Sequence, residues 1–164
     1  IKHDRTKIKE EVMSIDNKLK ELGITLKAPP SPVANYIPIQ QTGNLIYLSG
    51  QGPRNENGEF ITGKVGSDIT AEEAYDLARN TAINLLSAMN SYLGSLDRVS
   101  KIVKVLGMVN AVQDFKDHPK VINGCSDLFV EVFGEKGKHA RSAVGMGSLP
   151  NNMAVEIEII VEIE

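Results

Sequence analysis

The sequence predicts an α+β fold in which one β-sheet is covered on one face by two helices. Two segments have the apolar spacing of amphipathic helices, and they alternate along the chain with β-rich segments. The last β-rich segment alternates apolar and acidic residues, which is typical of a strand with one buried face. The length of 164 residues, with 41% hydrophobic and 24% charged residues, suits one folding unit with a substantial core.

The N-terminal part is expected to be a peripheral helix on a short connector. The segment from Thr6 to Leu22 has apolar residues at helical spacing, and Gly23 is a typical residue to end it. Residues 28–32 contain three prolines, which disfavour helix. We therefore assign residues 1–31 to a helix and Pro-rich connector, and residues 32–164 to the main domain.

The main domain is expected to begin with a β-hairpin. Residues from Asn35 to Gln41 and from Leu45 to Ser49 are rich in strand formers, and Thr42-Gly43-Asn44 between them is typical of a turn. The segment from Gly50 to Asp68 is rich in Gly and Asn, so it is predicted to be a loop.

Two helices should cover the sheet. The first runs from Thr70 to Gly94 and opens with a Ser/Thr-x-x-Glu capping pattern. The second runs from Asp117 to Gly134 with a proline in its first turn. Cys125 lies on the apolar stripe of this second helix, so a packed thiol is favoured over a nucleophile.

Three further strands are predicted. The run from Val99 to Val112 is β-branched and nearly continuously apolar, as expected of a central strand. Strands from Arg141 to Gly147 and from Met153 to Ile163 follow. In the last strand the odd-numbered positions face the core, and Ile160 faces the other way among the glutamates. Apolar groups on a face without helices predict burial against another copy of the chain.

Several classes of function are excluded or disfavoured by absent motifs and by charge. There is no P-loop, G-x-G-x-x-G, H-E-x-x-H or C-x-x-C pattern, and the three histidines are scattered, so we expect neither a metal nor a cofactor. A net charge of −3 disfavours a nucleic-acid partner. The absence of a long apolar stretch, together with a single cysteine, favours a cytoplasmic protein that does not enter membranes.

Several motifs resemble those of one family. The residues that carry the resemblance are Ala34-Asn35-Tyr36, Leu48-Ser49-Gly50-Gln51, Asp114-Phe115, Asn123, Ala140-Arg141-Ser142, Leu149-Pro150 and Val155-Glu156-Ile157-Glu158. In this order they resemble the Rid/YjgF family, often labelled endoribonuclease L-PSP, over about residues 32–163. The resemblance implies a chorismate-mutase-like mixed sheet with two helices on one face, assembled as a homotrimer with sites in the clefts between subunits.

The resemblance also implies an activity, the cofactor-independent hydrolysis of reactive 2-enamino and 2-imino acids to 2-oxo acids and ammonia. Arg141 would bind the substrate carboxylate and Glu156 would position the attacking water. The pocket would be lined by Tyr36, Ser49, Gly50 and Asn123. A planar guanidinium matches a carboxylate with two parallel hydrogen bonds, so the role implied for Arg141 is chemically sound.

Other interpretations stay open from the sequence alone. Arg141 also fits an ordinary salt bridge, and Glu156 also fits the solvated face of a strand. A trimer that only binds a small 2-oxo or amino acid needs the same arginine, and an endoribonuclease ranks below both because of the acidic charge balance. Two residues depart from the family pattern beside the inferred pocket. His139 replaces the usual proline before Ala-Arg-Ser, and Ala143 replaces a frequent cysteine.

Overall fold

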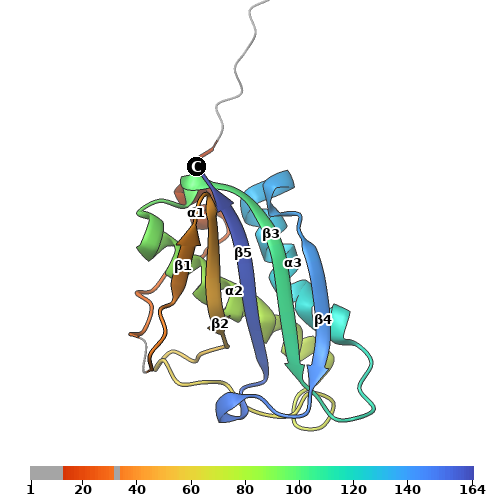
Figure 1. Ribbon diagram of the computed structural model, residues 1–164. Coiled ribbons are helices and arrows are strands. Elements are labelled where there is room, and N and C mark those ends of the chain that lie inside the picture. Colours follow the sequence, from red (N-terminus) through yellow and green to blue (C-terminus); the bar gives the residue numbers. More distant parts are fainter. Residues whose placement is uncertain (1–12, 32–33) are drawn as a thin grey trace, which may run out of the picture.

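The sheet and its covering helices form two layers, as Figure 1 shows. This computed structural model describes residues 13–31 and 34–164. The sheet has five strands in the order β1-β2-β5-β3-β4, and every neighbouring pair is antiparallel except the parallel pair β3 and β4. The strands are β1 Ile39–Thr42, β2 Leu45–Gln51, β3 Val99–Asn110, β4 Ala140–Met146 and β5 Val155–Ile163. The predicted α+β class is confirmed, with β3 in the interior of the sheet.

The two predicted helices are present and pack on the same face of the sheet (Figure 1). They are α2 Ala71–Leu93 and α3 His118–Phe133. The capping box predicted for α2 forms, because the Thr70 hydroxyl accepts from the Glu73 amide at 3.1 Å and the Glu73 carboxylate accepts from the Thr70 amide at 2.8 Å. Short 3-10 turns lie at Leu96–Arg98, Gly134–Gly137 and Pro150–Asn152.

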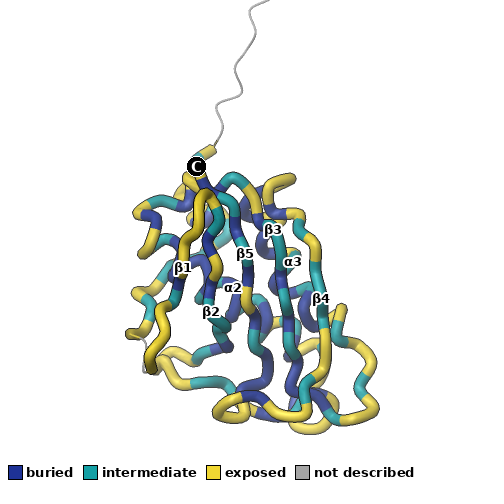
Figure 2. The backbone as a smooth tube through the Cα atoms, in the orientation of Figure 1, coloured by how far each residue is buried: buried dark blue, intermediate teal, exposed yellow. Residues whose placement is uncertain are grey.

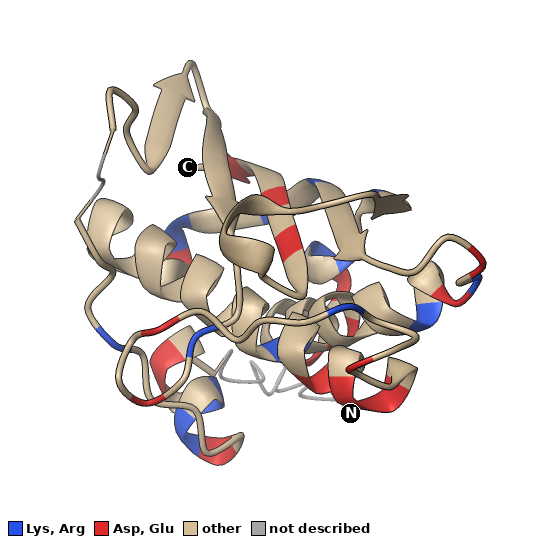
Figure 3. Cartoon of the chain, turned by 90° about the horizontal axis from the view of Figure 1, so that it is seen from below, with Lys and Arg blue, Asp and Glu red and all other residues tan. Residues whose placement is uncertain are grey.

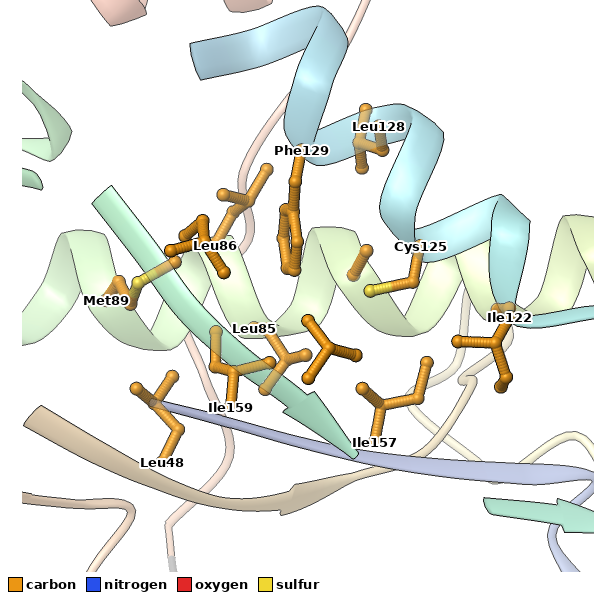
Figure 4. Packing of buried hydrophobic residues seen from close by; sticks show 14 of the residues in the cluster. Leu48, Leu85, Leu86, Met89, Ile122, Cys125, Leu128, Phe129, Ile157 and Ile159 are labelled. Atoms are coloured by element: carbon orange, nitrogen blue, oxygen red, sulfur yellow. The ribbon is translucent and has the colours of Figure 1, made fainter. Parts of the chain in front are cut away.

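The core lies between the sheet and the helix pair. Alternate residues of β5 from Val155 to Ile163 are buried, as its apolar pattern predicts. Figure 4 shows Ile157 and Ile159 of β5 facing side chains from α2 and α3. Cys125 lies in this cluster, and burial raises the pKa of its thiol, so the predicted packed thiol is confirmed. Exposed positions gather on the edge strands β1 and β4 and on the connecting loops (Figure 2).

A third helix, α1 Ile15–Glu21, is the C-terminal part of the predicted N-terminal helix. Residues 6–12 of that prediction lie outside the described residues. Leu19 of α1 is only 4% exposed and belongs to the core cluster, and the Ile15 amide donates to the Asp97 carboxylate at 2.9 Å. The described turns of this helix are therefore packed against the domain. The division at residue 31 stays a prediction.

The first strand is shorter than expected. Asn35 to Gln41 was predicted as a strand, but β1 begins only at Ile39. The segment before it contains Pro38, which has no amide hydrogen to donate to a ladder. Its carbonyl instead accepts from the Ser49 amide at 2.8 Å.

The second face of the sheet has no covering helix within the described residues (Figure 1). Strand register places Tyr47, Leu106, Met108, Val144 and Ile160 on this face. Tyr47 is 43% exposed and Val144 is 37% exposed. Glu156, Glu158 and Glu162 alternate with the buried residues of β5 and so lie on this face as well. Figure 3 colours the acidic positions of the chain red. None of the helices in the described residues has the length and apolarity to cross a membrane.

Candidate functional site

Arg141 projects from the edge strand β4 toward α3. It is in register with Val105 of β3, which is in register with Ile159 of β5. Val105 and Ile159 are both buried on the helix face, so Arg141 lies on that face too. Its Nη1 donates to the Asn123 side-chain oxygen at 2.8 Å and to the Ser126 hydroxyl at 3.1 Å. Two neutral side chains of α3 therefore hold the guanidinium in place.

One edge of the Arg141 guanidinium has no partner in the described part of the chain. Both hydrogen bonds use Nη1, and none of the described residues accepts from Nη2 or Nε. No described carboxylate lies within 4.0 Å of this side chain. The interpretation of Arg141 as an intrachain salt-bridge residue therefore gains no support. The edge formed by Nη2 and Nε suits the two oxygens of a ligand carboxylate.

Ser126 and His139 extend the support of Arg141. The Ser126 hydroxyl lies 2.8 Å from Nε2 of His139, and Nδ1 of His139 lies 2.7 Å from the Gly137 carbonyl oxygen. A carbonyl only accepts, so Nδ1 carries the hydrogen and Nε2 of the neutral ring accepts from Ser126. Burial lowers the pKa of His139, and the nearby charge of Arg141 lowers it further. The neutral ring thus fixes Ser126 as an acceptor for Arg141.

The sequence predictions missed this support. Ser126 was not singled out, and His139 was noted only as a departure from the family pattern. The sequence contains one signal that could have predicted the position of Ser126. Asn123 and Ser126 are three residues apart, so they share a face of the predicted helix. Asn123, by contrast, was predicted for the site and does contact Arg141.

Glu156 lies in a separate cavity of about 400 Å³, which is also lined by Tyr36, Gly50, Arg54 and Phe60. A Cβ added at Gly50 would lie 3.0 Å from the Glu156 carboxyl carbon, so any larger residue at position 50 would make the Glu156 side chain shift. Burial raises the pKa of Glu156, and the charge of Glu158 raises it further. A carboxyl group with a raised pKa is suited to accepting and returning a proton near neutral pH.

Ser49 forms hydrogen bonds to the segment that carries Tyr36, one of the residues that line this cavity. Its hydroxyl donates to the Ile37 carbonyl at 2.8 Å, and its amide donates to the Pro38 carbonyl. These bonds fasten the segment that carries Tyr36, whose side chain is 53% exposed at the cavity rim. Ser49 itself is not among the residues that line the cavity, so its evident role is to place Tyr36.

A single chain does not bring Arg141 and Glu156 together. Glu156 alternates with the buried Ile157 and so lies on the face without helices, whereas Arg141 lies on the helix face. Strand β3 also separates β4 from β5. The predicted residues therefore form two half-sites, one with Arg141 and Asn123 and the other with Tyr36, Gly50 and Glu156.

Metal-ligating side chains do not gather in either half-site. Across residues 13–31 and 34–164, no three His, Cys, Asp or Glu side chains lie close enough to hold a metal ion. The expectation that no cofactor is needed stays a prediction.

Comparison with known proteins identifies the family. A family model described as "YjgF/chorismate_mutase-like, putative endoribonuclease" matches residues 16–163. The chain belongs to the Rid/YjgF family. This Rid/YjgF chain is 42% identical over 146 residues to Protein TCP17 of Trypanosoma cruzi, covering 88% of this chain and 91% of the relative. It is 32% identical over 142 residues to a 2-iminobutanoate/2-iminopropanoate deaminase of Dermatophagoides farinae, covering 86% and 95%.

Solved structures of Rid/YjgF relatives share the fold. The crystal structure of protein Atu1372 from Agrobacterium tumefaciens has a TM-score of 0.85 and 44% identity, covering 92% of each chain. A second crystal structure, from Shewanella oneidensis MR-1, has a TM-score of 0.88 and 29% identity, covering 92% of this chain and 100% of the other. The chorismate-mutase-like arrangement implied by the motifs is therefore confirmed.

Proposed function

We propose that this protein hydrolyses reactive 2-imino and 2-enamino acids to 2-oxo acids and ammonia. The observation that carries the proposal is the guanidinium of Arg141, held by Asn123 and Ser126 with its Nη2 and Nε edge directed to no described carboxylate. Such a group selects small molecules that carry a carboxylate. A relative that is 32% identical is named as a deaminase of 2-iminobutanoate and 2-iminopropanoate, which supports the reaction class.

The two half-sites are proposed to meet between copies of the chain in a homotrimer. The face that carries Glu156 has exposed apolar groups such as Tyr47 and Val144, which a neighbouring copy would bury. Arg141 lies on the opposite face at the sheet edge, where it can approach a neighbour. Each site would then take Arg141 and Asn123 from one copy, and Tyr36, Gly50 and Glu156 from the next.

The chemistry needs a held substrate, a placed water and a group that moves a proton. Arg141 binds the carboxylate and so fixes the adjacent imine carbon. The imine reacts in its protonated form: Glu156 removes a proton from a water molecule while the water oxygen bonds to the imine carbon and the C=N electron pair moves to nitrogen, giving a neutral tetrahedral carbinolamine. Glu156 then returns that proton to the nitrogen. The C–N bond breaks as ammonia leaves with the electron pair, and Glu156 takes the hydroxyl proton as the C=O bond of the 2-oxo acid forms. The raised pKa of Glu156 suits both directions of proton transfer.

The test separates binding from turnover with two variants. In Arg141→Ala, 2-oxobutyrate should bind about tenfold to a hundredfold more weakly by calorimetry, because a charge-assisted pair is lost. In Glu156→Gln, binding should persist while release of 2-oxo acid from enzymatically generated imines falls about a hundredfold or more, because an amide accepts no proton. Arg141→Lys should already impair binding, since an ammonium keeps the charge but loses the planar fork.

Two outcomes would contradict the proposal. Unchanged affinity for 2-oxobutyrate in Arg141→Ala would remove the carboxylate anchor. Binding that depends on Arg141, without any imine hydrolysis by the wild-type protein, would show a binding protein in place of an enzyme.

A further inference from the structure

Arg54 lies in the same cavity as Glu156, on the loop that follows β2. Its amide donates to the Asn80 side-chain oxygen at 2.9 Å, and its carbonyl accepts from the Asn80 side-chain nitrogen at 3.2 Å. Asn80 belongs to α2, so a rigid helix fixes both peptide groups of Arg54. The backbone of Arg54 is therefore held by two hydrogen bonds to a helix, although it lies in a loop.

The Arg54 side chain is fixed as well. Its guanidinium carbon lies 3.9 Å from the centre of the Phe60 ring, and its Nη1 donates to the Gly58 carbonyl at 2.6 Å. Its Nε is buried and has no hydrogen-bond partner in the described part of the chain. A buried donor without a partner is rare in folded proteins and calls for an explanation.

No nearby acid balances the charge of Arg54. Within the described ranges, no carboxylate lies within 4.0 Å of its guanidinium. Glu56 pairs with Lys27 at 2.8 Å, and Glu59 accepts from Asn55 at 2.9 Å. The two acidic residues closest in sequence are therefore engaged elsewhere, and Arg54 keeps a fixed charge beside the cavity.

The cavity is large enough for a metabolite that spans both charged groups. Its volume of about 400 Å³ lies within the range of small-ligand pockets. An adjoining cavity of about 460 Å³ shares Pro30, Gln51 and Arg54 with it. A ligand whose reacting carbon lies at Glu156 has room to extend its other end toward Arg54.

We propose that Arg54 binds a second carboxylate, at the side-chain end of the substrate, so that dicarboxylic 2-imino acids are the preferred substrate class. This assignment of Arg54 rests on the proposed function, which places the reacting carbon at Glu156. The second carboxylate would balance the charge of Arg54 and contact its Nη2, which donates to none of the described residues. Monocarboxylic imines would leave that charge unpaired.

Calorimetry with two probes tests the assignment. Wild-type protein should bind 2-oxoglutarate about tenfold to a hundredfold more tightly than 2-oxobutyrate, because only the first has a second carboxylate. Arg54→Gln should bind both probes equally, with the affinity for 2-oxobutyrate unchanged. Lys27→Gln is the matched control, since it removes the same charge from the rim of the adjoining cavity and should keep the preference. Arg54→Lys should keep only part of the preference, as an ammonium lacks the planar group that stacks on Phe60 and so places the charge less firmly.

Two results would overturn the role of Arg54. One is equal affinity of the wild-type protein for the two probes, which needs no variant and so does not depend on how Arg54→Gln folds. The other is a preference for 2-oxoglutarate that survives in a folded Arg54→Gln protein.

Rates of imine hydrolysis separate this inference from the proposed function. Hydrolysis of 2-iminobutanoate and 2-iminoglutarate at equal kcat/KM, with no effect of Arg54→Gln, would sustain the deaminase and overturn the role of Arg54. A preference for 2-oxoglutarate that depends on Arg54, with neither imine hydrolysed, would sustain the carboxylate site and overturn the deaminase.

Discussion

Arg141 has a long side chain with several rotatable bonds, so without contacts to other residues it would adopt many rotamers. Holding it before a ligand arrives removes part of the ordering cost from the binding step. Asn123 and Ser126 do this through neutral oxygens, so they orient the guanidinium without cancelling its charge. His139 in turn orients Ser126.

His139 is therefore expected to act as a positioning residue. His139→Ala removes the acceptor of Ser126 and the ring that packs edge-on against Phe129, so Ser126, one of the two side chains that hold Arg141, loses its fixed orientation. We expect KM for imines to rise several-fold, by about 1 kcal/mol of lost hydrogen bonding, while kcat changes less. His139→Gln, which can still accept from Ser126, should restore most of the affinity.

A pH profile distinguishes this role from a purely structural one. Protonation of His139 turns Nε2 into a donor, so Ser126 can no longer donate to it and a second positive charge lies beside Arg141. Because the pKa of His139 is lowered, KM in the wild type should rise only below the usual titration range of histidine. A rise in KM at low pH that is the same in His139→Gln as in the wild type would contradict this role of His139.

Glu156 is expected to lower the stability of the protein at neutral pH. Its pKa in the folded state is raised above 4.5, so folded protein holds this proton more tightly than unfolded protein does. The loss of folding stability caused by ionising Glu156 is absent at pH values below the pKa of this residue in the unfolded protein. It reaches its full size once the pH exceeds the pKa of Glu156 in the folded protein. Glu156→Gln should therefore raise Tm at pH 7 and have little effect at pH 4.

Glu162→Gln, on the same strand, is the control for Glu156→Gln. Glu162 pairs at 3.8 Å with Lys101 at the surface, so its loss should change Tm little. A gain in Tm from Glu156→Gln that is the same at pH 4 and pH 7 would refute the link to its proton.

Sequence motifs pointed to Arg141, Glu156 and Asn123 as candidate site residues, because each stands in a recognisable pattern of neighbours. They did not point to the contacts of Ser126, His139 and Arg54. Those contacts arise from packing of α3 against the start of β4 and of the loop after β2 against α2, and neither leaves a periodic signal. Motifs also grouped Arg141 with Glu156, although strand alternation puts them on opposite faces.

At the scale of elements, α2 and α3 cross closely at Gly124. A methyl group added there would overlap the backbone carbonyl of Tyr75 on α2. Beside this contact, the Tyr75 hydroxyl of α2 donates a hydrogen bond to the Asp127 carboxylate of α3 at 2.6 Å. This bond raises the pKa of the Tyr75 phenol to about 12. The position of α3 matters for the proposed site because this helix carries Asn123 and Ser126, which hold Arg141.

Gly124→Ala should force the helices apart and destabilise the fold by about 1–3 kcal/mol, the usual cost of overpacking. The same shift should weaken 2-oxobutyrate binding, since α3 would carry Asn123 away from Arg141. Gly147→Ala is the control, because a methyl group there meets open space. Equal midpoints of denaturant unfolding for Gly124→Ala and wild type would contradict the close crossing.

Most elements could be predicted from periodicity, since α2, α3, β3 and β5 all have strong apolar patterns and clear ends. The limits of β1 could not, because the β-rich run before Ile39 includes Pro38, whose missing amide hydrogen ends the ladder. Leu19 lies on the apolar stripe of the predicted N-terminal helix and is buried. The proline-rich connector favoured a peripheral helix, and how far the domain depends on α1 stays a prediction.

At the scale of the molecule, one sheet carries Arg141 with its contact to Asn123 on one face and the cavity of Glu156 on the other. A small metabolite cannot pass between hydrogen-bonded strands to contact both faces of the sheet. The proposed reaction therefore requires a second copy of the chain to complete each site, as heterologous contacts in a closed ring would do.

Mixed oligomers test this requirement most directly. Arg141→Ala chains, about tenfold to a hundredfold less active alone, and Glu156→Gln chains, about a hundredfold or more less active alone, would be unfolded together and refolded at equal amounts. Differently tagged copies would show that the two have mixed. If every site takes Arg141 from one copy and Glu156 from its neighbour, about a quarter of the sites are intact, and about a quarter of wild-type imine hydrolysis should return. Mixed oligomers with no more activity than the two variants alone would contradict the shared site.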